Sequence, residues 1–234
     1  MNIKSFLFSF RPHASQTSFT EKFRSGLAGG VAILLLTLAL HYLVQAGFPL
    51  FIVASMAASA TLLYATPHSP LAQPWNLVGG HLVSALAGLI CGWLIPEPSL
   101  AAGAAVGAAI LSMELLSCLH PPSAATALLM VLVNSQFHDL GWGWALGIVA
   151  ANAGISLALA LVINNLLPGR RYPMHALHMA TPSRPVPPVS LEQPDFEWAL
   201  KQMDSVIDVS EEDLAEIYRL ALVRARTRTE STVP

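Results

Sequence analysis

The sequence predicts an all-α membrane protein, a polytopic helical bundle with about six transmembrane segments. Apolar residues make up 54% of the chain and charged residues only 11%. Between Ser25 and Gly169 the only charged side chains are Glu97, Glu114 and Asp139. Prolines and glycines divide this region into runs of about the length that crosses a bilayer. An apolar region this long is not the core of a soluble domain, so the chain is expected to cross the membrane several times.

The six apolar segments differ in length, and one of them is too short to span. They are predicted over about Gly26–Gln45, Phe48–Ala65, Asn76–Ile95, Ser99–Leu119, Pro121–Asn134 and Gly141–Leu167. A spanning helix needs roughly 20 residues, and the fifth segment offers fewer. It is therefore expected to begin part-way into the membrane, with its N-terminus inside the protein, where irregular backbone is tolerated.

Two pairs of segments resemble each other in the same order. Residues 57–63 of the second segment are similar to residues 123–129 of the fifth, and residues 79–87 of the third to residues 150–158 of the sixth. A unit of three helices repeated once enters from the opposite side, which would give a 3+3 inverted repeat. On this alignment the second segment also breaks near Ser55. Two half-helix N-termini would then approach each other.

The flanking regions differ in charge from the apolar domain. Lysine and arginine gather in residues 1–24 and directly after residue 169, so both termini are expected in the cytoplasm. The predicted parts are a tail (1–24), a transmembrane domain (25–171), a proline-rich linker (172–194) and a small cytoplasmic helical tail (195–234). We expect a multi-pass protein of a bacterial inner membrane that contacts lipid. Nucleic acid is not an expected partner, because the tail is acidic overall.

The motif His120-Pro121-Pro122 is the centre of the predicted site. Two prolines suit the start of a helix, because their missing N–H groups would have no partner there. An anion in the apolar domain would find no lysine or arginine, so its compensating charge would come from helix N-termini, each worth roughly +0.5. The N–H groups of residues 123–125 are expected to be free for this role. The candidate substrate-binding residues are His120, Pro121, Pro122, Ser123, Ala124, Thr126, Ser55, Ser59, His81 and Asn152.

Proton coupling has two candidate residues, His120 and Glu114. Histidine has a reference pKa near 6.5, so His120 could donate a hydrogen bond to the anion or carry a coupled proton. It could instead order the loop. Glu114 could relay a proton, or lie at the membrane boundary without a role. His81 is a functional candidate because it lies inside an apolar segment, although a plain interhelical hydrogen bond is the alternative.

Several stretches together resemble the HPP family of integral membrane proteins. They are His120–Leu128, Ala58–Leu63, Ser69–Asn76 with Gly79-Gly80-His81, and Asn164–Leu166 followed by Arg170–Pro173. The resemblance implies a transporter-like protein, and plastid and cyanobacterial relatives are linked to nitrite transport. Met56-Ala57 stands where a glycine is expected, and Ser123-Ala124 where Ala-Gly is common. We therefore expect transport of a small, nitrite-like inorganic anion, and a homo-oligomer is compatible with the glycine-rich faces.

Two other functions remain open from the sequence. One is a proton or cation pathway through Glu114, His120, His81 and His41. The other is a membrane sensor or scaffold that transports nothing and signals through its tail. An enzyme is not expected, because no serine–histidine–aspartate pattern, metalloprotease motif or phosphate-binding loop is present. No cofactor is expected, and no spacing of histidine, cysteine and glutamate is a recognisable metal-ligand set.

Overall fold

The computed structural model describes residues 10, 17–47, 52–134, 141–174 and 218. The chain divides into two units, one of Lys22–Met179 and one of Met1–Glu21 with Ala180–Pro234. The account below concerns the first unit. The predicted linker beyond residue 174 and the predicted helical tail lie outside the described residues, apart from Tyr218.

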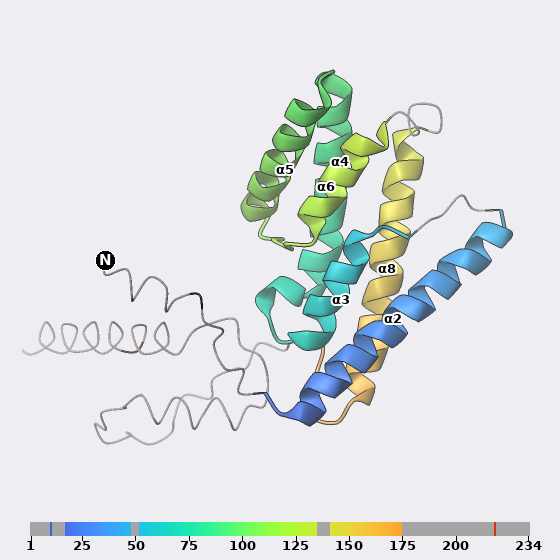
Figure 1. Cartoon of the computed structure of the whole chain (residues 1–234), viewed down its shortest axis with the longest axis vertical. Coiled ribbons are helices and arrows are strands. Elements are labelled where there is room, and N and C mark those ends of the chain that lie inside the picture. The colour runs from blue at the N-terminus through green and yellow to red at the C-terminus, as the bar shows by residue number, and fades with distance from the viewer. Residues whose placement is uncertain (1–9, 11–16, 48–51, 135–140, 175–217, 219–234) are drawn as a thin grey trace, which may run out of the picture. The chain divides into compact units, whose positions relative to one another are not determined.

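The regular structure of the described residues is helical (Figure 1). The elements are α2 (Phe19–Gln45), α3 (Ser55–Ala65), the short 3₁₀ helix η1 (Pro70–Ala72), α4 (Pro74–Leu94), α5 (Pro98–Leu115), α6 (Ser123–Leu132) and α8 (Trp142–Leu166). Four of them, α2, α4, α5 and α8, are long and apolar enough to cross a membrane. This confirms the predicted class, a helical membrane bundle.

Proline starts most of these helices. Pro74 and Pro98 occupy the first turn of α4 and α5, and α6 begins directly after Pro122. Two predicted boundaries are wrong. Helix α2 begins at Phe19, inside the predicted polar tail. Helix α5 ends at Leu115, four residues early, because Ser117 adopts a left-handed φ of 52° that stops the helix.

Helices α3 and α6 are too short to span. They contain 11 and 10 residues, or roughly 16 Å at 1.5 Å per residue, against about 30 Å of hydrocarbon. Their N-terminal ends point towards each other in the middle of the bundle (Figure 1). The predicted break near Ser55 is therefore present, and α3 and α6 have the opposite directions that an inverted repeat requires. The repeat as a whole stays a prediction.

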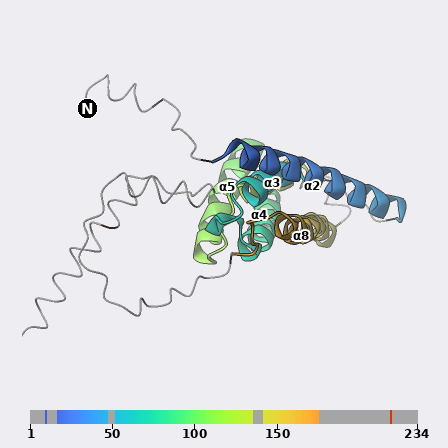
Figure 2. The same cartoon turned by 90° about the horizontal axis from the view of Figure 1, so that it is seen from below.

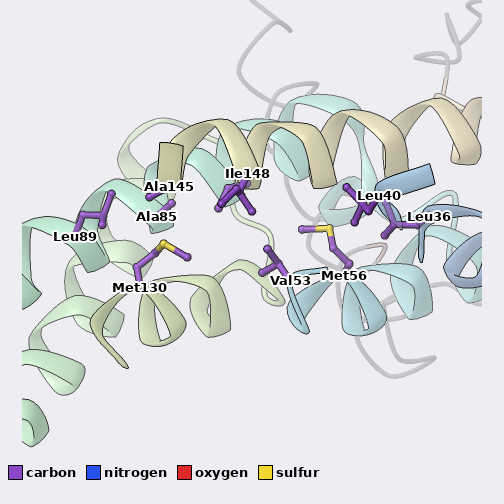
Figure 3. Close-up of a cluster of buried hydrophobic side chains, with 10 residues drawn as sticks. Leu36, Leu40, Val53, Met56, Ala85, Leu89, Met130, Ala145 and Ile148 are labelled. Atoms are coloured by element: carbon purple, nitrogen blue, oxygen red, sulfur yellow. The ribbon is translucent and has the colours of Figure 1, made fainter. Parts of the chain in front are cut away.

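Helix α4 lies at the centre and packs against α5, α6 and α8. Its tightest approach is at Gly88, where an added Cβ would collide with the carbonyl oxygen of Ala127 and lie 2.8 Å from the Cβ of Met130. The apolar cluster nearby joins α6, α8 and the start of α3. Figure 3 shows Met130 and Met56 on either side of Val53, facing Ala145 and Ile148.

Helix α2 buries a narrow stripe of side chains. Ala28, Ala32, Leu36 and Leu40, spaced every four residues, are its buried residues. They pack against α3 and α8, while α2 itself is strongly tilted against α8, which Figure 2 shows nearly end-on. The start of α2 and the end of α8 are tied together, since Arg170 Nη2 donates to Ser25 Oγ at 2.7 Å. The two ends of the domain therefore lie on the same side.

Glu97 caps the N-terminus of α5, and this makes the stability of the domain depend on pH. Its carboxylate accepts hydrogen bonds from the N–H groups of Leu100 and Ser99, which lower its pKa below the ordinary 4.5. A lowered pKa adds stability above the unfolded value, and this stability disappears as the pH falls through the folded value. We expect Glu97→Gln to melt below the wild type at neutral pH, with the difference vanishing in acid.

Thermal melting of the purified protein in detergent, measured from neutral pH down into acid, reports the effect. Glu114→Gln is the matched control, since it removes a carboxylate near the other end of α5 without touching the cap. An equal pH dependence of melting in Glu97→Gln and the wild type would contradict the prediction.

Candidate functional site

The two half-helices meet through their hydroxyl side chains. Ser55 opens α3 and Ser123 opens α6. Ser55 Oγ lies 2.7 Å from Thr126 Oγ1, so a hydrogen bond joins the first turns of the two helices. Both residues are buried, and the positive ends of both helix dipoles face the same interior region.

A buried amide fixes where α3 begins. Asn152 of α8 accepts a hydrogen bond from the N–H of Val53 at 3.0 Å and donates to the carbonyl of Ile148 at 2.9 Å. Its side chain is fully buried. The N–H of Val53 precedes the helix and cannot find an acceptor within it. Asn152 thus holds the start of α3 against α8.

Two fully buried histidines lie beside this junction. His81 comes from α4 and His120 from the segment that leads into α6. The hydroxyl of Ser59 bridges them, with its Oγ at 2.9 Å from Nε2 of each ring. The ring centroids are 5.2 Å apart. Their residues are 39 positions apart in the numbering of the sequence, so only the fold brings them together.

The second ring nitrogen of each histidine, Nδ1, also has a partner. His81 Nδ1 lies 2.8 Å from Thr126 Oγ1, and His120 Nδ1 lies 2.8 Å from the carbonyl oxygen of Leu71. Leu71 belongs to η1, which lies between the second and third predicted apolar segments. A hydrogen-bonded chain therefore runs from η1 through both histidines to the half-helix junction. We call this chain the polar relay; its members are Leu71, His120, Ser59, His81, Thr126 and Ser55.

Glycine lets the segment of His120 approach α4. A Cβ on Gly80 would lie 2.8 Å from the Cβ of His120 and 3.0 Å from Ser123 Oγ. The same segment is held to α4 at its start, where Asn76 Nδ2 donates to the carbonyl of Leu119 at 2.8 Å. Two contributions to the site are absent from the candidates predicted from the sequence: the Leu71 carbonyl, and the close approach of the His120 segment that Gly80 permits. Gly79-Gly80 beside His81 was the available signal for the second.

Ser123 is the member of the junction without a partner. Its hydroxyl is fully buried, and no protein atom of the described residues is placed to bond with it. Such a buried hydroxyl normally bonds to something, whether protein, water or ligand. It belongs to the first residue of α6 and packs closely against Gly80, where an added Cβ would lie 3.0 Å from it.

The predicted free N–H groups at the start of α6 are not free. Those of Ser123, Ala124 and Ala125 donate to the carbonyls of His120, Pro121 and Pro122 at 2.8, 3.2 and 3.2 Å. The expectation failed because the chain closes tight i→i−3 turns before the α-helical pattern begins. A ligand at this end of α6 would therefore bind to hydroxyl groups and be stabilised by the helix dipole, while these N–H groups stay bonded to carbonyls.

The remaining candidates lie in different surroundings. Pro122 is buried, Ala124 is half-buried and Pro121 is exposed. Glu114 is exposed on α5, and no hydrogen bond joins its side chain to the polar relay among the described residues. The described cationic side chain that is buried, Arg170, bonds to Asn164 and Ser25 at the end of α8.

An apolar helical bundle with two short helices meeting around buried polar side chains defines a multi-pass membrane protein. The chain belongs to the HPP family, because the family described as the HPP transmembrane region matches residues 14–173. This confirms the resemblance carried by the sequence motifs.

Two transmembrane proteins of Dictyostelium discoideum are similar to this chain. One is 39% identical over 155 residues, which cover 64% of the chain and 49% of that protein. The other is 36% identical over 128 residues, which cover 53% of the chain and 45% of that protein. The chain thus spans about half the length of these curated relatives. No solved structure matches it.

Proposed function

We propose that this protein carries a small, weakly hydrated monoanion such as nitrite across the membrane through the half-helix junction. The observation that supports this most is the meeting of two helix N-termini beside the unpartnered Ser123 hydroxyl. Two dipole ends worth roughly +0.5 charge each could balance one negative charge. Sulfate or phosphate would call for arginine or lysine, and neither residue occurs between Ser25 and Gly169.

The polar relay supports coupling of this transport to protons. Histidine is the side chain that carries protons near neutral pH, and the relay joins His81 to the junction directly and His120 to it through Ser59 and His81. Proton conduction without an anion is a second candidate function, favoured by the same continuous chain of hydrogen bonds.

The location is proposed from charge. Lysine and arginine flank the end at which Ser25 meets Arg170, so we assign this end to the cytoplasm. The membrane that we propose is a bacterial inner membrane. A reporter enzyme that is active only outside the cytoplasm, fused after residue 234, tests this orientation. Activity of that reporter would overturn it.

Flux in proteoliposomes tests the anion proposal. The full-length protein should take up nitrite with saturable kinetics, and sulfate or phosphate should not compete. Ser123→Ala should raise the KM for nitrite about tenfold, because a hydrogen bond to a charged ligand contributes about 1.5 kcal/mol or more. The matched control is Ser84→Ala, which removes a fully buried hydroxyl of α4 that contacts Met113 and lies outside the relay.

The same vesicles separate the two candidate functions. A pH-sensitive dye inside them reports proton entry with and without nitrite. Proton entry that needs nitrite supports coupled transport. Proton entry at the same rate without any anion, together with an unchanged nitrite signal in Ser123→Ala, would refute the anion site and favour the proton pathway.

A further inference from the structure

The direction of every hydrogen bond in the polar relay follows from one fixed acceptor. The carbonyl of Leu71 can only accept, so His120 carries a proton on Nδ1. A neutral His120 then accepts at Nε2, and the Ser59 hydroxyl must donate to it. Ser59 in turn accepts from His81, which therefore carries its proton on Nε2.

The other half of the relay is determined in the same way. A neutral His81 with its proton on Nε2 must accept at Nδ1, so Thr126 donates to it. Thr126 has then used its proton and must accept from Ser55. All five bonds run in one direction, from Ser55 to the Leu71 carbonyl. Each group between Ser55 and the Leu71 carbonyl both accepts and donates, which is the arrangement through which a proton can pass by successive transfers.

We propose that this chain is a proton relay: when His120 takes up a proton, every hydrogen bond between it and Ser55 reverses direction. The proposal deepens the proposed function and rests on it for its role in transport, because it identifies how a coupled proton would reach the half-helix junction. It assigns His81 as the tautomeric switch and Ser59 as the bridge.

The proton balance of the reversal is simple. A proton from the junction bonds to Ser55, whose own proton passes to Thr126. Thr126 gives its proton to His81 Nδ1. His81 releases its Nε2 proton to Ser59, and Ser59 gives its proton to His120 Nε2. One proton enters, His120 becomes a cation that donates to Leu71 and Ser59, and His81 stays neutral with its proton on the other nitrogen.

The surroundings favour one positive charge and not two. The two rings are enclosed by α3, α4, α6, η1 and the segment before α6. Among the described residues, no hydrogen bond or ion pair joins either imidazole to an aspartate, glutamate, lysine or arginine. The other titratable groups of these elements and their flanks are uncharged or neutral-capable side chains: Tyr64 of α3, Cys91 of α4, Cys118 beside Gly79, and His68, which is partly exposed near η1. Two cations with ring centroids 5.2 Å apart would lack a counter-ion.

Charge on His120 is favoured over charge on His81. A protonated His120 keeps a backbone carbonyl as the acceptor for one of its N–H groups, whereas both partners of His81 are hydroxyls. The Ser59 hydroxyl has one competing acceptor, the Ser55 carbonyl, at 3.2 Å. The imidazole nitrogens at 2.9 Å are closer, so the hydroxyl proton is expected to stay within the relay.

The reversal reaches the junction as a change in the Ser55 hydroxyl. In the neutral relay this hydroxyl donates to Thr126. After protonation it accepts from Thr126, and its own proton is free to bond to an anion beside the helix N-termini. Proton uptake would thus create a donor for the substrate, which is the coupling that symport requires.

Solid-state NMR of the full-length protein with ¹⁵N-labelled histidine, reconstituted in lipid bilayers, tests this without any transported anion. The chain has eight histidines, and the signals of interest are assigned by their loss in His81→Gln and His120→Gln. At alkaline pH we expect the Nε2–H tautomer of His81 and the Nδ1–H tautomer of His120. On acidification His120 should become doubly protonated, and His81 should switch to Nδ1–H at the same midpoint.

Three results would overturn the relay: a His81 tautomer that stays constant while His120 is protonated, two cationic histidines, or no titration of His120 before the protein denatures. Ser59→Ala should separate the His81 tautomer from the state of His120, while Ser84→Ala should preserve the coupled switch. If Ser59→Ala does not fold, the wild-type titration alone decides. A coupled switch in a protein without nitrite flux would refute the proposed function and keep the relay; nitrite flux without the switch would do the reverse.

Discussion

Gly88→Ala should be among the most destabilising single-methyl substitutions in the described part of the domain. The added Cβ would collide with the backbone carbonyl of Ala127 and crowd the Cβ of Met130. Neither atom is the free end of a flexible side chain, so α4 and α6 would have to move apart. Overpacking of this kind costs about 1–3 kcal/mol and occasionally more, and we expect a value near the top of that range.

Thermal denaturation in detergent, followed by size-exclusion recovery, measures this loss. Gly103→Ala and Gly107→Ala are matched controls, since they add the same methyl group on α5, where nothing lies within 4 Å. They should melt at or slightly above the wild-type temperature, because alanine favours a helix over glycine by up to about 1 kcal/mol. Equal melting of Gly88→Ala and these controls would contradict the close packing of α4 on α6.

Asn152→Leu should loosen the start of α3 and abolish transport. The substitution keeps a similar volume but leaves the buried N–H of Val53 without its acceptor. An unsatisfied buried donor costs about 1–3 kcal/mol. The half-helix would be free to shift, and with it the Ser55 hydroxyl that contacts Thr126.

Hydrogen-exchange mass spectrometry of a peptide covering residues 52–60 reports this directly. Its amides should exchange faster in Asn152→Leu than in the wild type. The control is Ser156→Ala, one turn further along α8, where the hydroxyl lost donates to the thioether of Met56 at 3.5 Å. Its exchange and nitrite flux should stay near those of the wild type. Unchanged exchange in Asn152→Leu would show that the amide does not position α3.

The sequence predicts the helices well because prolines and a scarcity of charge mark where they begin. It also identifies most of the polar relay, since serine, threonine and histidine are conspicuous in apolar segments. It could not predict the Leu71 carbonyl, because every residue has one and only the fold selects it. Nor could it predict that the N–H groups of residues 123–125 are occupied, because turn type at a helix start depends on local dihedral angles that several sequences share.

Asn152 is a second residue whose contacts the sequence could not predict. Its place in the internal alignment, opposite His81, marked it as a substrate contact. In the structure the two residues have different partners, since His81 bonds within the relay and Asn152 bonds to the backbone before α3. Positions that are aligned in the predicted repeat therefore have different contacts here, and the substrate contact of Asn152 stays a prediction.

The shortness of α3 and α6 has a consequence for how the protein is made. A helix that spans the bilayer can leave the translocation machinery by itself and pack against its neighbouring helices afterwards. Helices of 11 and 10 residues cannot, because their exposed ends would lie in hydrocarbon with unpaired backbone groups. Each needs its partner helices already beside it, mainly α4 for α6 and α8 for α3. Insertion and assembly of this domain are therefore expected to occur together. The half-helices that form the junction enter the membrane packed against their neighbours, and the candidate site is completed last.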